Sequence, residues 1–116
     1  MEKERILILG VTGMLGHTLF KEMNKNENFE VFGTTRNKNS LKDYFTLEEL
    51  SRIRDGVDAD NFETVIRAIA SVQPTIIINC IGIIKQLPIS RDPLTAITVN
   101  AQLPHLLLEL LKLGLF

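Results

Sequence analysis

The sequence contains little of what several classes of protein require. Its single cysteine, Cys80, excludes an internal disulfide bond and favours a reducing compartment. The two histidines, His17 and His105, do not form a metal-binding set with that cysteine. Thirteen basic side chains against fourteen acidic ones leave a formal net charge of -1, so no basic surplus is present to neutralise a run of phosphates. We therefore expect no disulfide scaffold, no metal site and no nucleic-acid partner.

Long apolar segments are also missing. The first apolar run, residues 6–9, is too short for the apolar part of a signal peptide. The runs at 75–84 and 106–116 are interrupted by polar residues, and neither reaches the roughly 18 residues that a membrane span requires. We expect a cytoplasmic protein that does not insert into a membrane.

What the chain does contain suits one compact α/β domain. Its 116 residues are 45% hydrophobic, which is enough for a single buried core. Apolar runs typical of buried strands alternate with segments whose apolar residues recur at helical spacing, which predicts a parallel sheet with crossover helices. We expect four strands at 5–9, 29–35, 53–57 and 75–80, and helices at 14–26, 47–53, 62–72 and 93–113.

Capping residues mark where three of these helices begin. Thr46 and Glu49 have the spacing of a capping box, and Asp60 is expected to cap the helix that follows it. Asp92, which a proline follows directly, marks the start of the last helix. These signals place helix starts where a chain of alternating strands and helices needs them.

Three glycines stand between the first strand and the first helix with the spacing of a dinucleotide-binding turn. Gly10 allows the tight turn, Gly13 lets backbone amides approach a pyrophosphate, and Gly16 lets the helix pack close to the strand. The helix N-terminus then offers unpaired N–H groups and a partial positive charge to an anion. A glycine turn that serves only helix packing is the alternative. On the first interpretation, the residues expected to bind the cofactor here also include Thr12, Met14 and Leu15.

The end of the second strand indicates which dinucleotide would bind. In dinucleotide-binding folds an acidic residue about 20 positions after the glycines accepts hydrogen bonds from the adenosine ribose. Here that place is taken by Thr34, Thr35 and Arg36, and Arg36 is suited to pair with a 2′-phosphate. NADP is therefore favoured over NAD. A solvated surface arginine is the alternative.

Further cofactor contacts are expected at the carboxyl ends of the third and fourth strands. Asp58 stands where the adenine ring would lie, and with Asp60 capping the helix its carboxylate is free to accept from the adenine amino group. A residue of a local turn is the alternative for Asp58. Cys80 is expected to be a buried small side chain rather than a nucleophile. The expected contacts at these two strand ends are Asp58, Ala59, Cys80, Ile81 and Gly82.

The glycine turn and the strand-end segments described above follow one another in the order found in the extended short-chain dehydrogenase/reductase family. The sequence resembles this family, and within it the dTDP-4-dehydrorhamnose reductase-like branch. The resemblance covers essentially the whole chain and rests on residues 6–17, 33–36, 57–58, 78–82 and 99–104. It implies a Rossmann-type doubly wound parallel sheet, of which this chain carries the four-strand portion in the order 3-2-1-4. It also implies that Asn100, on a helix, braces the fourth strand beside the cofactor. An ordinary polar-face residue is the alternative for Asn100.

Catalysis in that family depends on a Ser or Thr and a Tyr-x-x-x-Lys pair beyond the fourth strand. The only tyrosine here, Tyr44, is followed four residues later by Glu48, so the pair is absent. We expect residues 1–116 to be an NADP-binding Rossmann domain that lacks the catalytic and substrate-binding part. The resemblance implies a parent enzyme that reduces a 4-keto-6-deoxy sugar nucleotide for polysaccharide synthesis. Alternatives are an epimerase or dehydratase of the same superfamily and a noncatalytic NADP-binding module that pairs with another chain.

A sheet in the order 3-2-1-4 has its fourth strand, residues 75–80, at one edge. The N–H and C=O groups of such an edge are unpaired, and few charges protect this one. We therefore expect the isolated chain to associate with itself through that edge.

Overall fold

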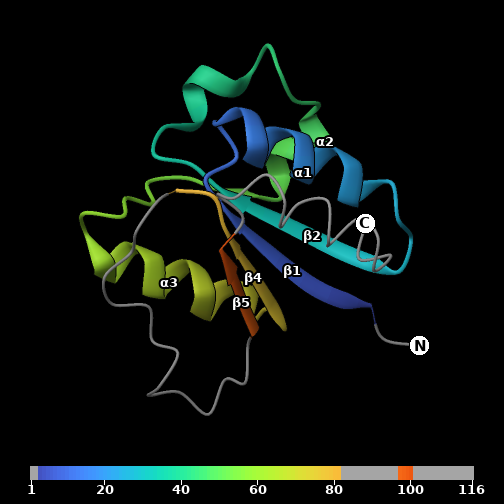
Figure 1. The fold of residues 1–116 in the computed structure, drawn as a ribbon. Helices are drawn as coiled ribbons and strands as arrows, with labels where there is room; N and C mark the ends of the chain where they lie inside the picture. The colour runs from blue at the N-terminus through green and yellow to red at the C-terminus, as the bar shows by residue number, and fades with distance from the viewer. Residues whose placement is uncertain (1–2, 82–96, 101–116) are drawn as a thin grey trace.

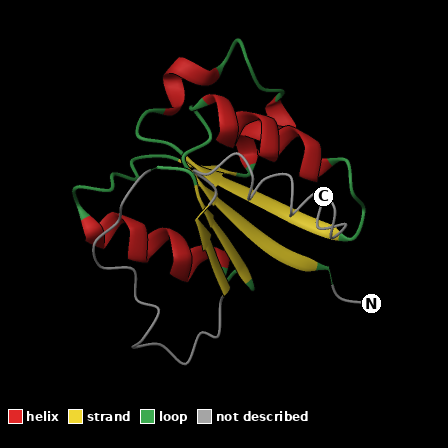
Figure 2. Ribbon diagram, viewed as in Figure 1, coloured by secondary structure: helices red, strands yellow, loops and turns green. Residues whose placement is uncertain are grey.

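The computed structural model describes residues 3–81 and 97–100 (Figure 1). Gly82 and the flanks of the expected last helix, 93–96 and 101–113, lie outside these described residues. Within the described part, the chain forms a parallel sheet with helices on both faces (Figure 2).

Five parallel strands make up the sheet, in the order β3-β2-β1-β4-β5. The central strand β1 aligns Ile8 with Gly33 of β2 on one side and with Ile78 of β4 on the other. Because β1 is covered on both faces, four consecutive residues, 6–9, are fully buried. The strands are β1 (Glu4–Leu9), β2 (Phe29–Thr34), β3 (Ile53–Arg54), β4 (Ile76–Asn79) and β5 (Ile97–Asn100).

Helices cover the sheet from opposite sides, as Figures 1 and 2 show. On one face, Leu19 and Phe20 of α1 (Met14–Asn24) pack with Ile6 and Ile8 of β1. On the other face, α3 (Phe62–Val72) packs against Leu7, Leu9 and Ile77, so alternate residues of β1 face alternate layers. A 3-10 turn, η1 (Lys38–Leu41), and the short helix α2 (Leu47–Ser51) connect β2 to β3. No helix among the described residues is long and apolar enough to cross a membrane.

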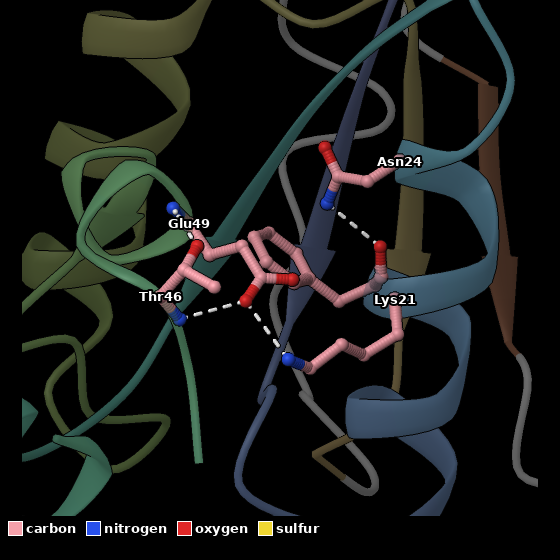
Figure 3. A network of polar contacts seen from close by, with 5 residues as sticks. Lys21, Asn24, Thr46 and Glu49 are labelled. Atoms are coloured by element: carbon pink, nitrogen blue, oxygen red, sulfur yellow. Dashed lines mark hydrogen bonds and ion pairs between the residues drawn. The ribbon is translucent and has the colours of Figure 1, made fainter. Parts of the chain in front are cut away.

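The capping box predicted at Thr46 is confirmed, and it also fastens α2 to α1 (Figure 3). Glu49 Oε1 accepts hydrogen bonds from the Thr46 N–H and from Lys21 Nζ of α1, each at 2.8 Å. Burial opposes ionisation of Glu49, but these hydrogen bonds outweigh it and lower the pKa of the carboxyl group. Lys21 also lies over the ring of Phe45, 4.9 Å from its centroid. The short connection is therefore held against α1 by the Lys21–Glu49 ion pair and by the packing of Phe45.

The predicted start of α3 is wrong by one residue. Asn61, not Asp60, is the N-cap residue, and its side chain makes no capping hydrogen bond. The Asp60 N–H instead donates to Asp58 Oδ1 at 2.9 Å, and the Asn61 N–H donates to the Asp58 carbonyl at 3.0 Å. Asp60 thus belongs to a turn organised by Asp58, because an aspartate side chain readily accepts from the amide two residues on.

The sheet order 3-2-1-4 is confirmed, but the expectation of a helix over 93–113 is wrong within the described residues. Residues Ile97–Asn100 form β5, which pairs with β4 so that Asn79 aligns with Asn100. Three β-branched residues in a row, 97–99, suit a strand, and β4 offers unpaired backbone groups to them. Asn100 is accordingly a strand residue rather than a helical one, and β4 is not the open edge that the sequence predicts.

Candidate functional site

A cavity of about 320 Å³ lies at the carboxyl ends of β1, β2, β3 and β4. In parallel α/β sheets ligands bind in the crevice outside these strand ends, so this is the expected place for a site. The residues that line the cavity are Gly10, Thr12, Gly13, Thr34, Thr35, Arg36, Asn37, Val57, Ala59, Cys80 and Ile81.

The three glycines of the turn have different surroundings. Gly10 has a φ of +87°, and a Cβ there would lie 2.8 Å from Ile81 Cγ1. A Cβ on Gly16 would overlap the carbonyl oxygen of Gly10, so the first turn of α1 touches the preceding loop directly. No atom lies within 4 Å of a Cβ placed on Gly13, which borders the cavity. Gly10 and Gly16 are therefore required by the fold itself, whereas the free space beside Gly13 is open to a ligand.

The N-terminus of α1 begins beside that free space. Gly13 is the N-cap residue, has no side chain to cap the helix, and is followed by no acidic residue in the first turn. The first amide with an intrahelical partner is that of His17, which donates to the Gly13 carbonyl at 2.9 Å. Helix geometry leaves the amides of Met14, Leu15 and Gly16 without such a partner. This end of the helix is suited to an anion.

Thr34 holds the turn against β2. Its Oγ1 accepts from the Gly10 N–H at 3.0 Å, and its carbonyl accepts from the Val11 N–H at 2.9 Å. The side chain is fully buried, so these contacts are shielded from water. The glycine turn is thus anchored at its first residue by a strand that lies more than 20 residues away in sequence.

The structure brings two of the predicted site residues together, Arg36 after β2 and Asp58 after β3. Arg36 Nε lies 3.8 Å from Asp58 Oδ1, and the two side chains are 74% and 41% exposed. The same carboxylate accepts from the Asp60 N–H. The sequence predicted a free Asp58 carboxylate, and this prediction is wrong, because the carboxylate is engaged within the chain. A contact this exposed contributes little stability, so a ligand can displace it at low cost.

At the end of β4 the chain presents a neutral wall. Cys80 and Ile81 line the cavity, and the Ile81 N–H donates to Asn79 Oδ1 at 3.0 Å. Burial raises the pKa of the Cys80 thiol to about 11, so the thiol is protonated at neutral pH. Cys80 is half-buried rather than fully buried as predicted, but it packs against the core, and its protonation argues against a nucleophile. In the described part of the chain, no cluster of three or more His, Cys, Asp or Glu residues could hold a metal ion.

Seven residues of the predicted site share the cavity wall, while Met14, Leu15, Gly16 and Asp58 lie beside it in the chain without lining it. Asn100 aligns with Asn79 on the neighbouring strand. Sequence reasoning did not assign Thr34, Thr35, Asn37 and Val57 to the site. Their one sequence signal is position, since each lies at the end of β2 or within three residues after β2 or β3. The residues predicted and found on the wall are Gly10, Thr12, Gly13, Arg36, Ala59, Cys80 and Ile81.

A model of the NAD dependent epimerase/dehydratase family matches residues 6–114. The chain belongs to this family. Its members are NAD(P)-dependent, which agrees with the glycine turn, the uncapped helix and the adjoining cavity. The predicted resemblance to the short-chain dehydrogenase/reductase group is thus confirmed at the level of this family.

One solved structure gives the fold a reference. It is the crystal structure of a putative epimerase from Burkholderia cenocepacia J2315, which is 17% identical and superimposes with a TM-score of 0.51. The match covers 71% of the present chain and 26% of the Burkholderia protein, so the present chain spans about a quarter of that protein's length. At this identity the likeness supports the fold alone. No curated protein matches the sequence.

Proposed function

We propose that this chain binds NADP(H) as the cofactor-binding part of a sugar-nucleotide reductase acting on a 4-keto-6-deoxy sugar. One observation carries the cofactor assignment. Where β2 ends at the cavity, the wall has an arginine, Arg36, and the residues that line the cavity include no Asp or Glu. A guanidinium favours a 2′-phosphate, whereas the ribose hydroxyls of NAD are usually held by a carboxylate at this place.

The residues present fit such a cofactor. The amides at the start of α1, which have no partner within the helix, and the open space at Gly13 suit a pyrophosphate. Arg36 would pair with the 2′-phosphate, and Asp58, released from Arg36, would accept from the adenine amino group. When bound, the cofactor supplies a hydride. The residues that line the cavity would position the cofactor. Among them, Cys80 and Ile81 form an uncharged wall on the β4 side.

Calorimetric titration with NADPH and NADH tests the proposal. Replacing Arg36 with Ala should lower NADPH affinity by roughly 1.5–3 kcal/mol, the range for hydrogen bonds to charged groups, and leave NADH affinity nearly unchanged. Arg67→Ala is the matched control, because Arg67 lies on α3, is exposed and pairs with Glu63 rather than with the cavity. Equal losses for both cofactors in Arg36→Ala would contradict a phosphate-binding role.

The family match favours a second candidate, an epimerase or a dehydratase. These activities need the same dinucleotide site but leave no net oxidation or reduction of the substrate, so they do not consume NADPH. With the whole protein and a 4-keto-6-deoxy sugar nucleotide, stoichiometric loss of NADPH absorbance would support the reductase. Product formation without that loss would support the second candidate. For either activity, the cytoplasm stays the predicted location of the protein.

A further inference from the structure

Thr35, the residue after β2, is buried, and its hydroxyl group makes no hydrogen bond with the described residues. Its side chain is 3% exposed, and Oγ1 has no hydrogen-bond partner among the described residues. Buried hydroxyls nearly always have a partner, because an unpaired one loses its bonds to water without replacement. The adjacent Thr34 is equally buried but accepts from the Gly10 N–H. The missing partner is therefore particular to Thr35 and does not follow from burial at this strand end.

The backbone of Thr35 is held on both sides. Its N–H donates to the Arg54 carbonyl and its carbonyl accepts from the Val57 N–H, each at 3.0 Å. Both bonds continue the pairing of β2 with β3 and with the turn that follows it. The residue cannot relieve its hydroxyl by moving its backbone, so only rotation about the Cα–Cβ bond remains. That rotation exchanges the hydroxyl and the methyl group between staggered positions.

Thr35 lines the cavity between Thr34 and Arg36. A rotamer that turned this oxygen toward the cavity would bring a hydroxyl to the same stretch of wall as Arg36, the next residue in the chain, whose guanidinium would hold an anion. A phosphate oxygen can only accept, so it would take the proton of this hydroxyl as a hydrogen bond. Such a bond to a charged group is stronger than one between neutral groups.

We propose that Thr35 is a specificity-determining residue whose hydroxyl donates to the phosphate group that Arg36 binds. The inference rests on the proposed function and assigns to that site a second donor for the adenosine 2′-phosphate. It gives a partner in the bound ligand to the buried, unpaired hydroxyl of a residue that lines the cavity. Valine has nearly the same shape and would remove the unpaired oxygen, so a residue kept only for packing could be valine.

The decisive variant is Thr35→Val, because the proposal predicts opposite effects on stability and on binding. Without ligand, its urea-unfolding midpoint should equal or exceed that of the wild type, since no hydrogen bond is lost. In calorimetry its NADPH affinity should fall about tenfold or more, while NADH affinity changes much less. Thr35→Ser keeps the hydroxyl and should retain the preference for NADPH. Thr18→Val is the matched control, because Thr18 is on α1 and its hydroxyl only donates to the Met14 carbonyl.

Adenosine 2′,5′-bisphosphate and AMP separate the phosphate from the rest of the cofactor. The bisphosphate should lose affinity in Thr35→Val and AMP should not. Inorganic phosphate alone should displace neither from the wild type at concentrations of a few millimolar, whereas strong displacement would show a general phosphate site and overturn the assignment to the 2′ position. If Thr35→Val unfolds, Thr35→Ala provides the same deletion of the hydroxyl without the β-branched shape.

Two results would overturn the role of Thr35. One is a lower unfolding midpoint in Thr35→Val with unchanged NADPH binding, which would mean that the hydroxyl has a partner within the protein. The other is an equal loss for NADPH and NADH. A wild type that binds neither cofactor would instead overturn the proposed function itself, so the two failures are distinguishable.

Discussion

Neighbouring residues of the same type have different tasks at the cavity, and the glycines and threonines show it most clearly. Gly16 is in contact with the backbone of Gly10, whereas Gly13 faces empty space. Thr34 anchors the glycine turn, whereas the hydroxyl of Thr35 has no partner among the described residues. The residue type alone therefore does not tell which of these groups serves the fold and which is available to a ligand.

Valine substitutions at the two glycines should separate these roles. Gly13→Val should fold, with a free energy of unfolding lowered by about 1 kcal/mol at most, because the N-cap backbone is extended and unobstructed. The same variant should lose NADPH binding, since its side chain would occupy the space at the helix N-terminus. Gly16→Val should lose about 3 kcal/mol of stability through its clash with the Gly10 carbonyl.

Urea denaturation followed by calorimetry on the folded variant measures both effects. Wild-type NADPH affinity in a folded Gly13→Val protein would show that the turn serves only the packing of the helix. Undiminished stability of Gly16→Val would mean that the helix can move away from the turn at little cost.

At the scale of elements, the connection between β2 and β3 depends on a few contacts with α1. It contains only a 3-10 turn and a five-residue helix, so its own backbone bonds stabilise it weakly. Glu49 joins the capping box of α2 to Lys21, and Phe45 is buried between His17, Phe20 and Lys21. This connection follows directly after Arg36, so its attachment to α1 also restrains the residues that lead out of the cavity.

Acid should weaken this attachment. The pKa of Glu49 is lowered in the folded chain below its usual value of 4.5, so its ionised form stabilises the fold above that value. As the pH falls through 4.5 and below, the contribution is progressively lost. Glu49→Gln should therefore lower the free energy of unfolding at pH 7 by about 1 kcal/mol, and the difference from the wild type should shrink toward pH 3.

Urea denaturation across this pH range, with Glu48→Gln as the control, measures the effect. Glu48 is adjacent in sequence, and its side chain is 81% exposed. A difference between Glu49→Gln and the wild type that stays constant from pH 7 to pH 3 would show that the Glu49 charge does not contribute.

At the scale of the whole molecule, the cavity is assembled from parts far apart in the sequence. The glycine turn follows β1, Thr35 and Arg36 follow β2, Val57 and Ala59 follow β3, and Cys80 follows β4. A ligand in the cavity would contact all these ends at once and bind only when the sheet is formed. Binding should then stabilise the entire described fold rather than one segment.

NADPH should therefore raise the stability of the chain by mass action. At a free concentration about 100 times its Kd, the expected gain in the free energy of unfolding is about 2.7 kcal/mol. NADH at the same concentration should produce a smaller gain, because it lacks the group that Arg36 is expected to bind. Thermal unfolding in a series of cofactor concentrations measures both, and midpoints that do not move with NADPH would contradict a site formed by the folded sheet.

The predicted self-association through the edge of β4 loses its structural basis, because β5 pairs with that edge. Ile77 faces α3 and is 4% exposed, so a lysine at this position would be buried and would report on folding rather than on association. Association of the isolated chain stays a prediction. Sedimentation velocity of the unmodified chain is the measurement that bears on it.

Much of the fold could be predicted because its signals are local. The apolar run at 6–9, the glycines after it and the capping box at Thr46 each determine a short stretch of backbone through neighbouring residues. The order 3-2-1-4 came from the resemblance to a known family, and the sheet has this order with β5 added beside β4. The strand at Ile97–Asn100 was missed because its apolar residues also fit a helix, and only pairing with β4 distinguishes the two.

The sequence by itself determined the glycine turn, the helix that follows it and the strand ends that reach the cavity, since these depend on residues within one or two turns of backbone. Only the tertiary structure decided that Arg36 meets Asp58, that Thr34 holds Gly10, and that the hydroxyl of Thr35 lacks a partner in the described chain. Each of these facts depends on which strand lies beside which and in what register. A polar group finds its partner across the sheet, where sequence distance gives no measure of proximity.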